Sequence, residues 1–430
     1  MTKTKKQDKK NPPPKNPDEV RREASPETYP APPAPSKGKV IGIDCHPDTF
    51  TVAVFKGTCL QDAEQLEVKL DISLKKLLEW IGQAGFDKRD LFLMEAGANS
   101  FELCRRLNAM GMRAVVLESA HVGKMAKQYA DNDRLAAIRI AKVFLIGEAP
   151  CVWIPDEKTM ERRQLLHAYQ RAVDANTRAT NALKGYLNQF TVRLGKRSAQ
   201  MPKTHDWVLK QRDWSRLEKG ILKGHFEEIL FTAKQRKSYY REITREMSQE
   251  TEMLKLLGLF GIGIINAFAL LAVIGDINRF ETPKRLVAYF GLNPGRRESG
   301  NGKLIKIGVG LRGRRDMRNL LIQAAQTVMR WGRATEIGKW GWKLFARKGY
   351  RNVAVAAVAR KLATQVWHLL KGNKPELLES SKKREVKLGK LLTTLGKSLR
   401  VELGLPEKTA EGIKHLDQFI TITLSQMKKT

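Results

Sequence analysis

Three acidic residues, Asp44, Glu95 and Asp133, lie at the ends of segments with the character of core structure. The chain around them is strongly basic, with 78 Lys+Arg against 45 Asp+Glu and a formal net charge of +33. A carboxylate at the tip of a buried strand in such a chain usually serves a cation. A divalent metal facing a phosphate suits both the acids and the basic surroundings, so we expect a Mg²⁺ site.

The elements that must position these acids can be read from the local hydrophobic pattern. Asp44 closes the run Lys39-Val-Ile-Gly-Ile-Asp44, and Glu95 follows Leu91-Phe-Leu-Met94; both runs are typical of short buried strands. Asp133 stands just ahead of residues 134–144, whose small and apolar spacing predicts a helix packed on a sheet. We therefore expect an α/β domain in which two strand ends and a helix start bring the acids together.

Taken singly, each acid also has an ordinary structural explanation. Asp44 could be a turn residue and Glu95 the partner of a nearby Arg, while Asp131 or Asp133 could cap the helix. The order of the acids along the chain favours the metal site, but their spacing does not require it.

Composition indicates a folded protein with a basic, disordered start. The chain has 430 residues and 42% hydrophobic content, which allows two or three domains. Residues 1–38 are rich in Pro and Lys, with almost no apolar residues, and lack the apolar region of a secretory signal. The cysteines show no metal-binding spacing, so free thiols in a reducing cytoplasm are expected for Cys45, Cys59, Cys104 and Cys151.

The apolar stretch from Gly258 to Gly275 is just long enough to suggest a membrane helix. Its glycines interrupt it, and we predict a buried helix pair with no membrane contact. Gly261 and Gly263 resemble the turn of a helix-hairpin-helix, in which backbone amides meet a DNA phosphate.

Residues 156–190 have the heptad spacing of a coiled coil, followed by a second helix over about 218–257. The two predicted seams run through Leu166, Val173, Thr180 and Leu187, and through Tyr169, Asn176, Leu183 and Phe190. The helices could form an antiparallel hairpin within one chain. Alternatively, the arm could also dimerise the protein, with Asn176 fixing its register.

Ser299 lies in a Gly/Pro/Arg-rich segment that we interpret as a loop between helices. The basic residues near it could hold a phosphodiester, and they include Arg296, Arg297, Lys303, Lys306, Arg312, Arg314 and Arg315. No His–Asp partner for the serine is evident. Such a serine would attack phosphate with metal or arginine activation; otherwise it is a turn residue.

Together these motifs resemble the transposases of the insertion sequence 110 family, including its 1111 branch. Over residues 38–372, their order along the chain is that of the family: the strand ending at Asp44, Met-Glu-Ala-Gly97, the Asp133 helix, the coiled-coil insert, Gly261-Ile-Gly263, Leu286-Val-Ala-Tyr-Phe-Gly-Leu-Asn-Pro294 and Glu-Ser-Gly300.

The resemblance implies a RuvC-like, ribonuclease-H-type domain with an Asp-Glu-Asp-Asp metal site. Asp44, Glu95 and Asp133 match the first three acids and Ser299 matches the nucleophile of the C-terminal transposase domain. It further implies a serine–DNA phosphate intermediate, a bridge RNA that selects the DNA, and a dimer or tetramer. The fourth acid is absent, because Ala136 occupies its place; Asp131 could substitute, or three acids could suffice.

The expected organisation is a RuvC-like domain over 39–154, a helical arm over 155–255, a mainly α transposase domain over 256–372 and a basic helical extension over 373–430. The extension could be a solvated tail or an added nucleic-acid contact. The leading function is a cytoplasmic, nucleoid-associated DNA transposase. The alternatives are a RuvC-type nuclease that uses water, and a nucleic-acid-binding descendant without activity.

Overall fold

The computed structural model describes residues 38–97, 99–124, 132–147, 150–298, 304–309 and 313–427. The predicted disordered arm therefore lies outside the described residues, except for Gly38. The chain divides into two compact units, of which one comprises Thr28–Asp156 and the other is built on Glu157–Thr430. Each unit has its own hydrophobic core.

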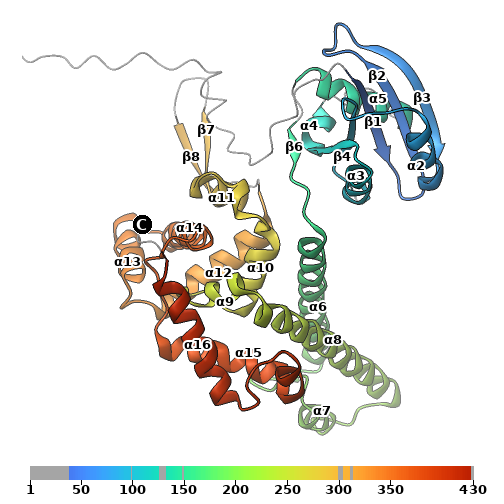
Figure 1. Cartoon of the computed structure of the whole chain (residues 1–430). Helices are drawn as coiled ribbons and strands as arrows, with labels where there is room; N and C mark the ends of the chain where they lie inside the picture. The colour runs from blue at the N-terminus through green and yellow to red at the C-terminus, as the bar shows by residue number, and fades with distance from the viewer. Residues whose placement is uncertain are drawn as a thin grey trace, which may run out of the picture. The chain divides into compact units, whose positions relative to one another are not determined.

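The N-terminal unit is built on a six-stranded mixed sheet with strand order β3-β2-β1-β4-β5-β6 (Figure 1). β1 is antiparallel to β2 and parallel to β4, which in turn is parallel to β5. The strands are β1 (Lys39–Cys45), β2 (Phe50–Lys56), β3 (Glu64–Ile72), β4 (Leu91–Glu95), β5 (Arg113–Leu117) and β6 (Cys151–Val152). This arrangement of a mixed sheet before a mostly helical remainder fits a RuvC-like domain.

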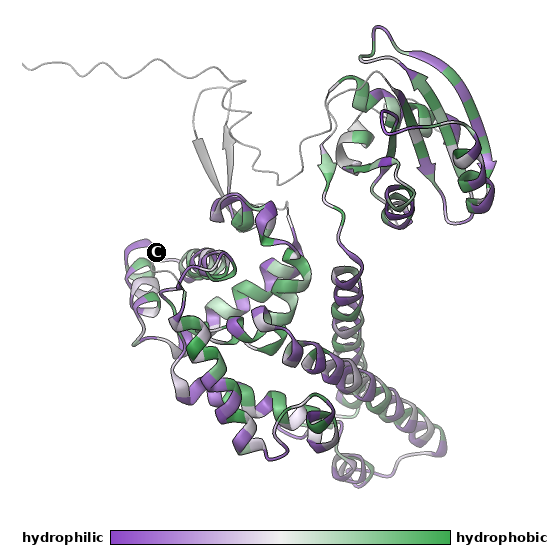
Figure 2. Cartoon of the chain, viewed as in Figure 1, coloured by the Kyte–Doolittle hydropathy of each residue, from purple (hydrophilic) through white to green (hydrophobic). Residues whose placement is uncertain are grey.

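Helices cover both faces of the central strands. α5 (Asp133–Leu145) packs on one face, against residues such as Val40 and Leu93. α2 (Leu74–Gln83) and α3 (Ser100–Ala109) pack on the other, against Ile41 and Phe92. Because both faces are buried, β1, β2 and β4 read as continuous apolar runs, which Figure 2 shows as hydrophobic ribbon. The short helix α4 (Ser119–Lys124) follows β5.

The second unit begins with a long helical pair. α6 (Glu157–Asn188) packs along α8 (Arg216–Gln249), with α7 (Pro202–Leu209) between them in sequence. A capping box fixes the start of α8, where Ser215 and Glu218 each accept a hydrogen bond from the other's backbone. The predicted second helix is in fact two helices, α8 and α9 (Thr251–Leu257), because the backbone adopts an extended conformation at Glu250 between them.

The buried side of α6 differs slightly from the predicted seams. Four predicted seam residues are buried as expected: Leu166, Asn176, Leu183 and Leu187. The helix ends before Phe190. At two other positions the buried residue is the preceding alanine, Ala172 in place of Val173 and Ala179 in place of Thr180. Small residues at those positions allow the two helices to approach closely.

The rest of this unit is mainly helical around one core, with a single described hairpin of strands (Figure 1). The elements are α10 (Ile264–Ile274), the 3-10 turn η1 (Ile277–Arg279), α11 (Pro283–Tyr289), β7 (Pro294–Glu298), β8 (Leu304–Val309), α12 (Arg315–Trp331), α13 (Glu336–Lys348) and α14 (Arg351–Leu370). α10 is almost entirely buried, which accounts for its apolar sequence. Within the described ranges no helix combines the length and apolar character needed to cross a membrane.

The C-terminal extension is folded into this core. α15 (Ser381–Glu402) and α16 (Thr409–Ser425) bury leucines of both helices, among them Leu391 and Leu416, in the same cluster as α9 and α10. α16 closes on the loop after α9, where a β-carbon on Gly258 would lie 2.8 Å from Leu424 Cδ1. This packing excludes a solvated tail.

Candidate functional site

Asp44 and Glu95 lie at the same end of two adjacent parallel strands. The β1–β4 register pairs Ile43 with Met94. Asp44 and Glu95 are the next residues of the two strands, so they lie beside each other. Strand alternation places both on the face that α5 covers, because Ile43 and Met94 belong to the opposite cluster. The sheet thus presents two carboxylate residues at one edge of one face.

Gly42 brings the third acid to this edge. A β-carbon at Gly42 would lie 2.2 Å from the Ala137 carbonyl oxygen, so α5 crosses β1 in backbone contact there. Asp133 is one helical turn before Ala137, and Asp44 is two residues after Gly42 on the same face. Asn132 caps the helix through a hydrogen bond from Leu135 N to its side chain, and Asp133 occupies the first turn as predicted.

His46 completes a compact cluster with two of these acids. Its Nε2 lies 3.1 Å from Asp44 Oδ2 and 3.2 Å from Asp133 Oδ1. Ligand atoms of Asp44, His46 and Asp133 all lie within 4.8 Å of one another. The backbone of His46 is anchored by Asn99, whose Nδ2 donates to the His46 carbonyl oxygen over 2.5 Å.

Sequence reasoning missed His46 as a ligand candidate. Its only signal was its place two residues after the first acid, in the turn where β1 ends. A histidine there is common in unrelated turns, and the contact with Asp133 arises only from the packing of α5.

The environment of Asp44 favours a bound cation. Burial raises the pKa of the Asp44 carboxyl above its ordinary value; His46 lowers it through charge and hydrogen bonding, and the nearby Asp133 raises it further. A carboxylate that is costly to ionise gains most from a metal, which supplies the missing positive charge. Two carboxylates and an imidazole fit a divalent ion; oxygen ligands suit Mg²⁺, and the nitrogen also suits Mn²⁺.

The other positions that we expected to contribute to the metal site do not belong to this cluster. Glu95 lies at the end of β4 but outside the cluster formed by Asp44, His46 and Asp133. Ala136 sits in the first turns of α5, so no carboxylate takes its place. Asp131 lies outside the described residues.

The segment around Ser299 contains a β-hairpin, and our expectation of a loop between helices is wrong in this respect. β7 and β8 pair antiparallel, with Arg296 opposite Lys306 and Arg297 opposite Ile305. The sequence did not predict these strands, because Gly and Pro flank the arginines of β7 and are uncommon in strands. Ser299 follows β7 directly and, like Lys303 and Arg312, lies outside the described residues.

Three guanidinium groups surround Tyr289, just before this hairpin. Arg314 donates its backbone N–H to the Tyr289 carbonyl oxygen over 2.9 Å and pairs with Asp316 through two hydrogen bonds of 3.0 and 2.6 Å. Burial alone would raise the pKa of the Tyr289 hydroxyl, but the charges of Arg279, Arg314 and Arg163 lower it below its ordinary value. Arg315 begins α12. A positive environment thus adjoins the hairpin.

Gly261 and Gly263 lie in the turn between α9 and α10. Gly261 has φ of +80°, and a β-carbon there would lie 2.8 Å from Val328 Cγ2 of α12. Gly263 precedes α10 and has open space where a β-carbon would be. Gly261 therefore serves close packing, and Gly263 faces an accessible region.

The sequence is similar to known transposases over both units. Residues 41–192 match a DEDD transposase domain, and residues 254–337 match the family described as Transposase IS116/IS110/IS902. The transposase for insertion sequence element IS1111A of Coxiella burnetii is 23% identical over 336 residues, covering 77% of this chain and 89% of that protein. Protein y4qE of Sinorhizobium fredii is 26% identical over 64% of this chain and 74% of its own length. A pilin gene-inverting protein of Moraxella lacunata is 27% identical over 31% of this chain and 40% of its own.

The mixed sheet with its acidic edge, followed by the matched helical domain, defines a transposase. The chain belongs to the IS110 family of insertion-sequence transposases, as the motifs of the sequence indicated.

Proposed function

We propose that this transposase cuts and rejoins DNA through a covalent bond to Ser299, with a divalent metal held at Asp44, His46 and Asp133. The single observation that carries the proposal is the convergence of these three side chains within 4.8 Å at the edge of the sheet. Glu95, at the end of the adjacent strand, would support the same metal through water. The metal, Mg²⁺ in the first instance, would neutralise charge on the scissile phosphate.

In the proposed step, the Ser299 oxygen bonds to phosphorus while one phosphorus–oxygen bond of the DNA backbone breaks. The proton of the serine leaves to solvent or a nearby base, and the departing DNA oxygen takes up a proton. Arginines of the hairpin and of the Tyr289 environment would hold the phosphate during attack. The similarity to a protein named for inverting a pilin gene supports conservative exchange, since inversion requires that cut ends be rejoined.

The finer assignments from the family resemblance belong to the same proposal. A bridge RNA would select the DNA, and a dimer or tetramer would bring two sites together. The α6–α8 arm would act as a coiled coil, and α9–turn–α10 as a helix-hairpin-helix contacting DNA phosphate. The net charge of +33 supports a polyanionic partner.

The decisive experiment is to incubate the purified protein, its co-purifying RNA and Mg²⁺ or Mn²⁺ with DNA spanning the element ends. Wild type, Ser299→Ala and Asp44→Asn are compared for a protease-sensitive protein–DNA adduct. We expect an adduct with wild type alone. Cleavage by Ser299→Ala would contradict the serine mechanism and identify a water-using nuclease. Binding without cleavage by wild type would identify an inactive descendant, for which the absent acid at position 136 gives a reason.

A further inference from the structure

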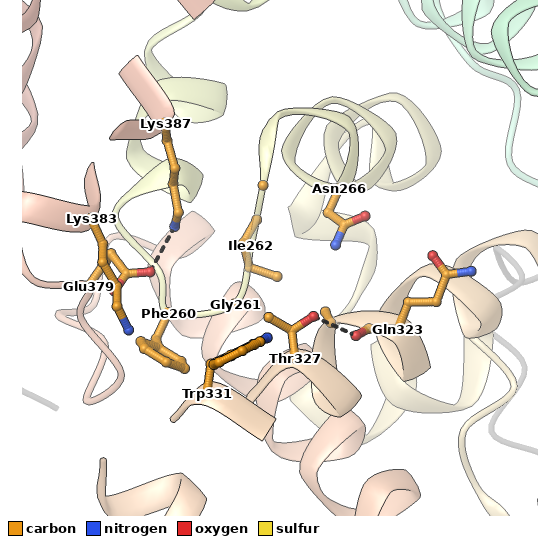
Figure 3. A pocket seen from close by; sticks show the side chains of 12 residues that line it. Phe260, Gly261, Ile262, Asn266, Gln323, Thr327, Trp331, Glu379, Lys383 and Lys387 are labelled. Carbon is orange, nitrogen blue, oxygen red and sulfur yellow. Dashed lines mark hydrogen bonds and ion pairs between the residues drawn. The ribbon is translucent and has the colours of Figure 1, made fainter. Parts of the chain in front are cut away.

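An open pocket of about 490 Å³ lies where the turn before α10, helix α12 and the C-terminal extension meet (Figure 3). The turn from Phe260 to Gly263 forms its floor, and α12 contributes Gln323, Thr327 and Trp331. The third side comes from the extension, with Glu379, Lys383 and Lys387. The volume is in the range of small-molecule sites.

The extension is fixed to the turn by backbone and side-chain bonds. Phe260 N donates to the Leu377 carbonyl oxygen over 3.0 Å, and Glu379 N donates to that of Gly258 over 2.7 Å. Lys387 Nζ donates to the carbonyl oxygens of Leu257 and Leu259, each at 2.9 Å, and pairs with Glu379 Oε2 at 3.1 Å. These contacts hold the extension against the turn.

One end of the pocket presents aromatic surface beside positive charge. Trp331 is 68% exposed at the end of α12, and the Arg330 guanidinium lies 4.9 Å from its ring centroid. Lys383 Nζ lies 4.6 Å from the Phe260 ring centroid. The acid of the pocket, Glu379, already pairs with Lys387, so its charge is compensated. A flat, apolar partner with an attached anion would satisfy these groups together.

The end of the pocket away from Trp331 presents two side-chain amides. Asn266 and Gln323 both line the pocket, and Figure 3 shows their amide groups at one end of it. No residue in the described ranges forms a hydrogen bond with either side-chain amide. Carboxamides supply a donor and an acceptor side by side, which matches the edge of a nucleobase.

We propose that this pocket receives one unstacked nucleotide of a single strand, with its base against Trp331 and its phosphate towards Lys383. Stacking on an exposed aromatic residue captures bases whatever their sequence, and Asn266 and Gln323 would add preference among bases. The inference rests on the proposed function only in taking nucleic acid as the partner. The proposal gives the C-terminal extension a role in binding nucleic acid, because α15 contributes the lysines of the pocket, Lys383 and Lys387.

The test is binding of short labelled oligonucleotides to the full chain in EDTA, measured by fluorescence anisotropy with DNA and RNA arms of one sequence. We expect Trp331→Ala to weaken single-strand binding about tenfold, as loss of one stacked base does, and Trp331→Phe to retain most of it. Lys383→Gln should reduce the slope of log K against log salt by about 0.7. The arm that responds identifies the strand as DNA or RNA.

Tyr350→Ala is the matched control, because Tyr350 is an aromatic residue of the same unit with 73% exposure and lies outside the pocket. It should bind like wild type, and none of the variants should lose affinity for a duplex. Equal affinities for Trp331→Ala and Tyr350→Ala in both arms would overturn the proposal, as would an equal loss on duplex. Because EDTA removes the metal chemistry, failure of the adduct experiment leaves this test intact, and the reverse also holds.

Discussion

Gly42 of β1 and Ala137 of α5 are in backbone contact, and no side chain larger than hydrogen fits between them. This contact sets the distance between sheet and helix at the point where Asp44 and Asp133 must meet. The candidate metal site therefore depends on a residue that carries no chemistry.

Gly42→Ala should damage both stability and metal binding. Its methyl group would overlap the Ala137 carbonyl oxygen, forcing α5 and Asp133 away from Asp44. We expect a loss of about 1–3 kcal/mol in the free energy of unfolding, as for other overpacked sites. Mn²⁺ affinity, measured by calorimetry, should fall with it.

Gly82→Ala provides the control, since a β-carbon at Gly82 in α2 would meet nothing within 4 Å. That change should stabilise the helix by about 0.5–1 kcal/mol and leave metal binding intact. Unchanged Mn²⁺ affinity in Gly42→Ala would contradict the positioning role.

Asp44→Asn should stabilise the metal-free protein while abolishing its response to metal. The folded-state pKa of Asp44 is raised, so its ionisation costs stability as the pH rises above the ordinary range of Asp. The neutral amide removes that cost at pH 7, and the melting temperature without metal should increase.

Metal should stabilise the wild type and leave the Asp44→Asn variant almost unchanged. At a Mn²⁺ concentration of about 100 Kd, wild type should gain about 2.7 kcal/mol and the variant almost nothing. Thermal unfolding with and without Mn²⁺ measures both effects, and equal metal stabilisation of both proteins would exclude Asp44 as a ligand.

β1, β4 and α5 were predictable because each has a clear local pattern of apolar residues. The ends of β1 and β4 could be placed where each apolar run meets an acidic residue, and the Asp133 helix from its first-turn acid. His46 could not, since its contact with Asp133 is a tertiary one. The β7–β8 hairpin was also missed, because Gly, Pro and Arg dominate a segment whose pairing depends on its surroundings.

The C-terminal extension shows the same limit. Its many lysines suggest a solvated tail, but they alternate with leucines that α9 and α16 bury. The role of Lys387 is still less visible in sequence, because it bonds to carbonyl groups about 130 residues earlier in the chain.

Lys387→Met should destabilise the C-terminal unit strongly. Glu379 is 4% exposed in its side chain, and removal of Lys387 would leave its charge buried and unpaired. The expected cost is about 3–5 kcal/mol. Lys390→Met, on the same helix but exposed, should change little. Chemical denaturation of both variants and of the double variant Lys387→Met/Glu379→Gln, which should recover part of the loss, tests the pairing.

Asn176→Ala should weaken the α6–α8 arm without changing the oligomeric state. Asn176 is 5% exposed, and its amide donates to the Ile229 carbonyl oxygen and to Thr232 Oγ1 at 3.0 and 2.9 Å. Gln200 Nε2 donates to its Oδ1, so both the nitrogen and the oxygen of the Asn176 amide are hydrogen-bonded within the arm. We expect a loss of about 1–3 kcal/mol from unsatisfied buried groups. A change of mass in light scattering would contradict this and point to a dimer interface.

Tyr289 should ionise at a lower pH than is ordinary for a tyrosine. The charges of Arg279, Arg314 and Arg163 outweigh its burial, so its folded-state pKa lies below its ordinary value. Because the folded protein then releases the proton first, Tyr289 adds stability as the pH rises from its folded pKa to its unfolded pKa, and adds none below that window. Ultraviolet difference absorbance of tyrosinate during a pH titration should show an early component in wild type that is absent from Tyr289→Phe. If both proteins titrate alike, the guanidinium groups do not act on this hydroxyl, and the positive environment proposed to hold the phosphate beside the hairpin loses its main support.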